Sequence, residues 1–473
     1  MLNKKDYIWA LIGKLLPSFL YLLTTMVLTR IISPEDFGKV GTLSIFFVVA
    51  NTLMDAGLGG SLIKESHLTK RDCSTISSFN VTVSLFLYCL LFLFAPLIES
   101  FYGVEGLAKV SRLLCLIFVI NSFGLVPRAL LTRNLRFKTL SIISIISVTV
   151  AAIVSIVLAF NDYRVYALIA YQVTNSICNV LISIVVSGYW VSFGFSSDSF
   201  KRLFKFGVFT TISTTIDTIY ENLTTTLFGK FLNMQEAGYL HQAKRLEEFP
   251  SQGITTTISN VSFPVLTKLR DDRTRFNAEC NSTFKIVILL LTPLLLSIAL
   301  YSKPIIVLLF GDMWIPAAPY LSLLIWASVF QIAETLIRSF IKASCEVELL
   351  LKYTVIKRII GIAIILVFLF IDPPLALYGY VISSVIGYII NLSAFSKIAE
   401  VQMSNSISLF LRYIFPGCFY YLISYFLNNH LNSLLLQIII SAFLLFFYYF
   451  GLLKFYGIDL KKYIYKDILK KLR

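Results

Sequence analysis

Long apolar runs recur along the whole chain, and they limit its fold more than any other feature. Each run is about twenty residues long, enough for an α-helix to cross a hydrocarbon core of roughly 30 Å. Such a helix satisfies its own backbone hydrogen bonds inside the bilayer. Apolar residues make up 57% of the 473 residues and charged residues only 14%. The composition therefore argues against an ordinary soluble protein.

The runs predict an all-α integral membrane protein with about fourteen transmembrane helices. Six spans are expected near 7–30, 38–63, 77–98, 107–131, 140–160 and 165–188. Six more are expected near 204–229, 238–264, 282–301, 317–341, 352–371 and 375–395. The last two are expected near 408–427 and 433–453. The first run resembles a signal peptide, but its length and the lack of a small-residue cleavage site favour an uncleaved span.

The distribution of basic residues predicts the orientation. Most of the 41 Lys and Arg residues fall in loops and termini that would share one side of the membrane, and such an excess marks the cytoplasm. The opposite loops and the adjoining span ends hold few: Arg30, Lys39, Lys109, Arg112, Arg164, Lys230 and Lys303. Both termini are therefore expected in the cytoplasm. Topology also explains the net charge of +15 without a nucleic-acid partner.

Several kinds of catalytic and metal site are not indicated. The seven cysteines show no paired spacing and the three histidines are scattered, so neither a disulfide framework nor a metal site is predicted. The chain has no GxxxxGK[ST], HExxH or GxSxG motif, which would mark nucleotide hydrolysis or hydrolase chemistry. We therefore expect no enzyme and no cofactor, and transport driven by an ion gradient or by removal of product.

Two matches in the same order predict an internal duplication. RIISPEDFG from Arg30 matches KFLNMQEAG from Lys230 at an offset of 200 residues. A second match, at an offset of 210, pairs Asn121, Arg128 and Thr132 with Gln331, Arg338 and Lys342. Six spans separate the copies, an even number, so both halves point the same way, as in transporters built from parallel repeats.

The repeat predicts the domain organisation. We expect an N-terminal lobe of six helices at 1–200 and a C-terminal lobe of six helices at 201–400. Two extra helices and a basic cytoplasmic tail would follow at 401–473. In parallel-repeat transporters the substrate site lies between the two halves.

Charged residues inside the expected spans predict a hydrated central cavity. A charge at the bilayer centre costs about 2.5–3.5 kcal/mol on insertion scales, so it usually faces water or a partner. Helical spacing places the polar residues of the first, second, seventh and eighth spans on single faces. The candidate substrate-binding residues are Lys14, Asp55, Arg128, Asp217, Glu221, His241, Lys244, Arg245, Glu248, Arg338 and Lys342.

Other roles for these residues remain open from the sequence. Lys14 could snorkel to the membrane surface, and Arg128 and Arg338 could anchor helix ends in the cytoplasm. The deep charges of the seventh and eighth spans could form a structural ion-pair network. These two spans form a hairpin near Asn233, so Glu221 and Arg245, each twelve residues from the turn, would lie level and could pair.

A stretch near the N-terminus resembles a known family. Residues 30–65 read RIISPEDFGKVGTLSIFFVVANTLMDAGLGGSLIKE, which resembles the first hairpin of bacterial polysaccharide flippases of the O-antigen, colanic acid and teichuronic acid type. These flippases belong to the multidrug/oligosaccharidyl-lipid/polysaccharide exporter superfamily. Further similar stretches are ALLTRNLRFKTLS at 129–141, GYLHQAKRLEEFP at 238–250, SFPVLTKLRDD at 262–272 and LLFGDMW at 308–314.

The resemblance implies a substrate and a location. It implies an oligosaccharide linked to undecaprenyl diphosphate, flipped from the cytoplasmic to the periplasmic leaflet of the bacterial inner membrane. Membrane lipids and the polysaccharide polymerase machinery would be its partners. The diphosphate needs cationic side chains, and the sugars need water and polar acceptors. A drug or organic-cation antiporter of the same superfamily is the alternative, and its cavity should be acidic with aromatic walls.

Overall fold

The computed structural model describes residues 4–55, 58–65, 68–269, 272–344, 347–399, 403–431 and 433–455. Contacts divide the chain into two compact units. The first unit holds Met1–Gln242 and Val307–Ile315, and the second holds Ala243–Ile306 and Pro316–Arg473. These units do not test the lobe boundaries expected at residues 200 and 400, which stay predictions.

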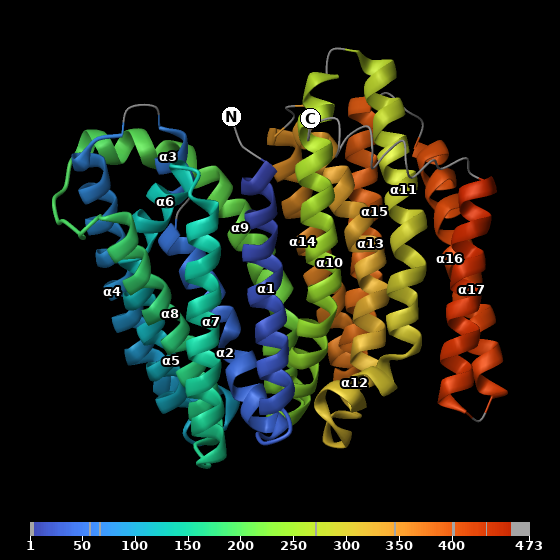
Figure 1. The fold of residues 1–473 in the computed structure, drawn as a ribbon, viewed down its shortest axis with the longest axis horizontal. Coiled ribbons are helices and arrows are strands. Elements are labelled where there is room, and N and C mark those ends of the chain that lie inside the picture. Colours follow the sequence, from blue (N-terminus) through green and yellow to red (C-terminus); the bar gives the residue numbers. More distant parts are fainter. Residues whose placement is uncertain are drawn as a thin grey trace. The chain divides into compact units, whose positions relative to one another are not determined.

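Every expected span coincides with a helix or a helix pair (Figure 1). The helices up to the middle of the chain are α1 (Lys4–Leu28), α2 (Pro34–Asp55), α3 (Leu58–Lys64), α4 (Lys70–Tyr102), α5 (Leu107–Ser122), α6 (Leu125–Arg133), α7 (Phe137–Phe160), α8 (Arg164–Ser187), α9 (Ser197–Phe231) and α10 (Met234–Lys268). The remaining helices are α11 (Arg273–Leu300), α12 (Ser302–Phe310), η1 (Asp312–Trp314), α13 (Ala317–Ala343), α14 (Val347–Ile371), η2 (Pro373–Leu375), α15 (Ala376–Ala399), α16 (Met403–Asn429) and α17 (Leu434–Phe455).

Length and apolar character identify membrane-spanning helices directly. In the described ranges, 10 helices are long and apolar enough to cross a membrane, or up to 11 if α5 and α6, bent by 44° at their junction, form one span. The apolar part of α1, Ile12–Leu28, is shorter than these. Helices α9 and α10 are not among these spans. They carry several charged residues, which lower their mean hydropathy below that of the spanning helices. The all-helical membrane fold is confirmed, and the count of fourteen stays a prediction.

Local signals explain where several helices begin and end. Thr69 and Asp72 form a reciprocal capping box at the start of α4, which satisfies two otherwise unpaired backbone N–H groups. Gly103 ends α4 with φ of 67°, a left-handed conformation that glycine adopts without a steric penalty. At the expected turn between α9 and α10, the Asn233 side chain accepts a hydrogen bond of 2.8 Å from the Glu236 N–H. α10 therefore begins directly after Asn233, where the sequence predicts a turn, and the hairpin of α9 and α10 stays a prediction.

Close helix crossings in the first unit depend on glycine. A Cβ on Gly38 would overlap the carbonyl of Met234, and a Cβ on Gly238 would overlap the carbonyl of Pro34. The two contacts are reciprocal at the 200-residue offset, because position 34 corresponds to 234 and position 38 to 238. Only residues without a side chain allow the starts of α2 and α10 to approach this closely.

Apolar helix faces build the rest of both units. In the first unit α7 packs on α1 and α8, α4 packs on α5, and α3 packs on α6. The ends of α3 and α6 lie at the same end of this unit as the start of α1 (Figure 1). In the second unit α15 packs on α13 and α14, α11 packs on α13, and α16 packs on α11 and α17. The faces of α16 and α17 that remain exposed are rich in Phe and Leu, as expected for helices that contact lipid.

Candidate functional site: a polar cavity and buried charges

A polar cavity lies inside the first unit, among α2, α3, α4, α5 and α6. Its volume of about 490 Å³ falls within the range of about 300–1,000 Å³ typical of small-molecule sites. The lining residues are Asn51, Met54, Gly59, Ile63, Asn80, Asn121, Leu125, Arg128, Ala129 and Thr132. Among these ten residues Arg128 is the only charged one, and none is aromatic.

Helix geometry brings the polar residues together. Arg128 and Thr132 are four residues apart and share one face of α6, and Asn121 lies near the end of α5. Asn51 comes from α2 and Asn80 from α4. The structure thus places the predicted site residue Arg128 on a cavity wall, together with Asn121 and Thr132 of the repeat match.

The guanidinium of Arg128 is held in place by its own helix. Its Nε donates a hydrogen bond of 3.1 Å to the carbonyl of Gly124. A Cβ at Gly124 would lie 2.9 Å from Nη2 of Arg128 and 2.8 Å from Cγ2 of Val180. Glycine at this position therefore makes room for the guanidinium beside α8.

The other candidates in the first unit have different surroundings. Lys14 and Glu221 are exposed, and Asp217 is half-buried. The half-buried His241 packs over Gly41, where a Cβ would lie 2.7 Å from the ring. Asp55 ends α2, but its side chain lies outside the described part of the chain.

In the second unit the candidate residues are less buried than Glu247, which is not one of them. Lys244, Glu248 and Arg338 are half-buried, whereas Arg245 and Lys342 are exposed. Glu247 is buried, and the hydroxyl of Ser328 on α13 donates a hydrogen bond to it. Glu247 is not among the candidates from the sequence, because a row of charges along α10 does not show which one faces α13.

Another buried pair was missed by the sequence analysis. Lys357 of α14 donates a hydrogen bond to Glu334 of α13, and their side chains are only 1% and 6% exposed. The charges of Arg338 and Arg358 also act on Glu334. On α15, a Cβ at Gly387 would lie 3.1 Å from Oε2 of Glu334, so the pair is enclosed by three helices.

A signal for this pair was present in the sequence. Glu334 and Lys357 are charges inside expected apolar spans, and such charges usually have a partner or a function. The sequence analysis counted Lys357 only among the many Lys and Arg residues near one side of the membrane. The structure shows that its side chain is buried beside Glu334.

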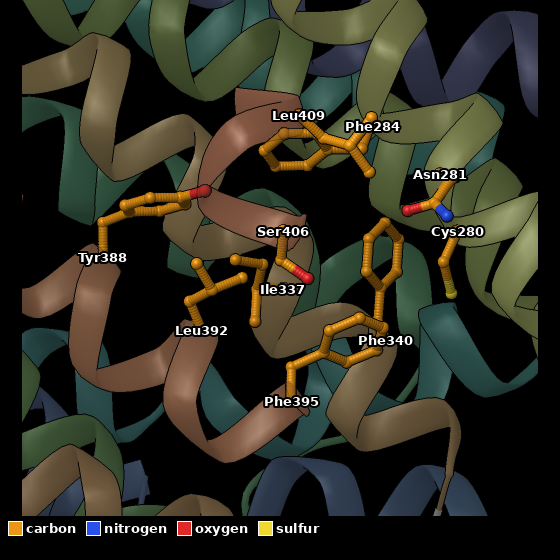
Figure 2. A pocket seen from close by; sticks show the side chains of 10 residues that line it. All are labelled: Cys280, Asn281, Phe284, Ile337, Phe340, Tyr388, Leu392, Phe395, Ser406 and Leu409. Carbon is orange, nitrogen blue, oxygen red and sulfur yellow. The ribbon is translucent and has the colours of Figure 1, made fainter. Parts of the chain in front are cut away.

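A second cavity, in the second unit, is too small for a substrate. Its volume is about 20 Å³, enough for about one water molecule. Figure 2 shows the rings of Phe284, Phe340 and Phe395 around it, with Tyr388 and Ser406 nearby. This space is a packing gap between α11, α13, α15 and α16.

Three of the stretches that suggested the family meet in the first unit. The Trp314 ring makes edge contacts with Phe37, Tyr239 and Phe310. Its Nε1 donates a hydrogen bond of 2.8 Å to the carbonyl of Thr29. These stretches therefore serve packing within the first unit.

Sequence comparison identifies the family. The polysaccharide biosynthesis protein family matches residues 27–319. The lipopolysaccharide biosynthesis protein WzxC of Escherichia coli is 25% identical over 361 residues, which cover 76% of this chain and 73% of the relative. The succinoglycan biosynthesis transport protein ExoT of Rhizobium meliloti is 25% identical over 316 residues, covering 67% and 64%. The teichuronic acid biosynthesis protein TuaB of Bacillus subtilis is 26% identical over 293 residues, covering 60% and 59%.

Solved structures show the same fold. The lipid II flippase MurJ in an inward closed conformation superposes with a TM-score of 0.74 at 17% identity, covering 98% of this chain and 100% of that chain. An inward-facing multidrug transporter of the MATE family gives a TM-score of 0.63 at 16% identity, covering 83% and 98%. These findings confirm the resemblance noted in the sequence. The chain belongs to the polysaccharide biosynthesis protein family and is a multi-pass membrane transporter rather than an enzyme.

Proposed function

We propose that this protein flips oligosaccharides linked to undecaprenyl diphosphate from the cytoplasmic to the periplasmic leaflet of the inner membrane. The relatives are named for succinoglycan, lipopolysaccharide and teichuronic acid biosynthesis, and the structural neighbour MurJ for lipid II. Such substrates share a polyhydroxylated headgroup and an anionic lipid carrier. They would need a polar, cationic route through an apolar protein.

The observation that carries this proposal is the cavity around Arg128. It places one cation and four neutral polar side chains inside a bundle of apolar helices. Amides and hydroxyls hydrogen-bond sugars, and Arg binds phosphate and carboxylate groups well. If the termini are cytoplasmic, the cavity lies towards the cytoplasmic end of the first unit and can receive a headgroup from that side.

The proposed mechanism is alternating access of a charged central cavity between two lobes. Its candidate substrate contacts are the residues selected from the sequence, with Arg128 as the first to test. The lobes would be related by a parallel repeat, followed by two appended helices. Three corresponding helix packings support the repeat: α4 on α5, α5 on α8 and α7 on α8 correspond to α11 on α13, α13 on α15 and α14 on α15. A polysaccharide polymerase would take the flipped units.

An organic-cation antiporter is the competing proposal, because multidrug transporters share the fold. A cation substrate favours carboxylates and aromatic faces in its site. The described lining of the cavity offers a guanidinium, amides and a hydroxyl instead. Its chemistry therefore favours an anionic or neutral hydroxylated substrate.

Gene deletion tests the proposed function. Loss of the gene should leave lipid-linked repeat units on the cytoplasmic leaflet and remove the surface polysaccharide. A plasmid copy should restore the polymer, and a copy with Arg128→Gln should restore much less at matched expression. Normal polymer in the deletion strain, with no second flippase present, would contradict the proposal.

A further inference from the structure

The segment that joins α8 to α9, residues 189–196, is fastened along the start of α4. It has no regular secondary structure, and it lies at the end of the first unit where α3 also lies (Figure 1). The hydroxyl of Ser78 donates a hydrogen bond of 3.2 Å to the Gly194 carbonyl and accepts one of 2.9 Å from the Gly194 N–H. The Ser196 N–H donates another, of 3.1 Å, to the hydroxyl of Thr75. We call residues 189–196 the strap.

The strap exposes three large aromatic side chains. Trp190, Phe193 and Phe195 are 76%, 67% and 62% exposed. Side chains alternate in direction along an extended chain, and Ser196, whose neighbour Phe195 is exposed, is buried against α4. The aromatic residues therefore lie on the outer side of the strap, where they form an apolar surface that needs a partner or a lipid environment.

The level of the strap along α4 matches a membrane interface. α4 is 33 residues long, about 50 Å at 1.5 Å per residue, whereas a hydrocarbon core needs only about twenty residues. The apolar run of α4 is expected to begin at residue 77, so the strap crosses α4 between Thr75 and Ser78, where that run begins. Trp and Tyr are enriched at this level of a membrane.

The hydrogen bonds of the strap suit the same environment. Backbone that is not helical needs partners for its polar groups where lipid replaces water. Hydroxyls of α4 bond both polar groups of Gly194 and the N–H of Ser196. The strap can therefore approach lipid without leaving these groups unpaired.

The charge around the strap is positive. Lys70, Arg71 and Lys201 are exposed, and Arg202 is paired with Asp72 at 2.8 Å. Five basic residues against three acidic ones leave a net positive charge in this region. Basic residues close to a membrane surface attract anionic phospholipids. The charged residues within 65–78 and 189–205 are Glu65, Lys70, Arg71, Asp72, Asp198, Lys201, Arg202 and Lys205.

We propose that the strap is an interfacial anchor that binds anionic phospholipids of the leaflet at this end of the first unit. Trp190, Phe193 and Phe195 lie among the lipid headgroups and the first segments of the acyl chains, and the exposed bases bind the headgroup phosphates. A lipid fits this surface better than a protein partner, because the surface lies where α4 enters the bilayer. The anchor does not depend on the substrate that the protein transports.

Quenching of Trp190 fluorescence by brominated lipids tests the position of the strap. The full-length protein and its Trp190→Phe variant are compared in nanodiscs, and their difference separates Trp190 from the other three tryptophans of the chain. Bromine near the headgroup should quench this difference signal about two-fold more strongly than bromine near the chain ends, as for other interfacial tryptophans.

The choice of lipid is tested in nanodiscs of equal parts phosphatidylglycerol and phosphatidylcholine, with bromine on only one of the two. Brominated phosphatidylglycerol should quench Trp190 about two-fold more than brominated phosphatidylcholine, because the bases concentrate the anionic lipid. The triple variant Lys70→Gln, Arg71→Gln, Lys201→Gln should lose this preference. The matched control Lys70→Arg, Arg71→Lys, Lys201→Arg keeps the charge and should retain the preference.

Several results would overturn the inference, and most need only the unchanged protein and Trp190→Phe. No quenching of Trp190 by any brominated lipid would mean that the aromatic surface faces water or a protein partner. Stronger quenching by bromine near the chain ends would place Trp190 in the hydrocarbon core instead of the interface. Equal quenching by the two lipids, or an undiminished preference in a folded triple Gln variant, would refute the binding of anionic lipid by these bases.

Discussion

Single charged residues in this chain differ more in their surroundings than their sequence positions suggest. Lys357 and Lys14 are both lysines near one end of an apolar run, yet Lys14 is exposed and Lys357 is enclosed with Glu334 between three helices. Taking two charges out of water is costly, and their attraction offsets that cost only while both remain. The stability of the second unit therefore depends on Glu334 and Lys357 being present together.

Single and double substitutions test this dependence. Glu334→Gln and Lys357→Met should each lower the free energy of unfolding by about 3–5 kcal/mol, because each leaves one buried charge without its partner. The double variant should be more stable than either single variant, because no uncompensated charge remains. Thermal unfolding of the purified proteins in one detergent measures the order of stability.

Exposed Lys352 on the same helix provides the control for this comparison. Lys352→Met should leave the unfolding temperature close to that of the unchanged protein. A double variant that is less stable than both single variants would show that the two side chains contribute independently, contrary to this prediction.

Sequence patterns predicted well where the helices lie along the chain. They predicted poorly which side chains contact one another. Every expected span coincides with a helix or a helix pair, and α10 begins directly after Asn233, whose side chain caps it. Hydropathy depends only on the local chain, so it located helices reliably. Which charge on α10 is buried depends on Ser328, eighty-one residues away. Spacing along one helix contains no information about such a contact.

The hairpin of α9 and α10 that the sequence predicts leads to a prediction of its own. Glu221 and Arg245 lie equally far from the turn at Asn233, about 18 Å along each helix at 1.5 Å per residue. We expect Arg245 or Lys244 to neutralise Glu221, and a bound diphosphate would compete for the cation. Glu221→Gln and Arg245→Gln should therefore each reduce transport several-fold, and the double variant should lose less than the two effects combined.

Complementation of a deletion strain at matched expression measures this coupling. Glu236→Gln, near the turn on the same hairpin, is the control and should transport normally. Strictly additive losses in the double variant would show that Glu221 and Arg245 act independently. This result would contradict the expected neutralisation of Glu221 by Arg245.

For the whole molecule, the proposed repeat pairs positions that have different roles in the two units. At an offset of 210 residues, Asn121 corresponds to Gln331. Asn121 lines the cavity, whereas Gln331 donates hydrogen bonds to Tyr380 and Ser384 of α15. Equivalent polar positions thus face a cavity in one unit and join helices in the other. The sequence repeat located both sets, but their different roles depend on packing against α15, which the pattern does not contain.

The orientation of the whole chain is the remaining prediction, and contacts in the first unit make it more specific. At one end of this unit, Arg133 donates hydrogen bonds to the carbonyls of Leu62 and Glu65, so the loops after α3 and α6 lie together. At the other end, Lys230 donates to the carbonyl of Phe101, and Arg30 donates to the carbonyl of Leu308. The loop positions of the first unit therefore form two groups.

Reporter fusions at these loops should give the same two groups. The excess of Lys and Arg marks the first end as cytoplasmic, so fusions after Lys70 and Arg136 should give a cytoplasmic signal. Fusions near Gly103, Asn233 and Asp312 should give a periplasmic signal, and one after Lys268 should again be cytoplasmic if α10 crosses the membrane. Paired cytoplasmic and periplasmic reporters at each site control for expression. A periplasmic signal after Arg136 would refute the orientation, and a periplasmic signal after Lys268 alone would show that α10 does not span the membrane.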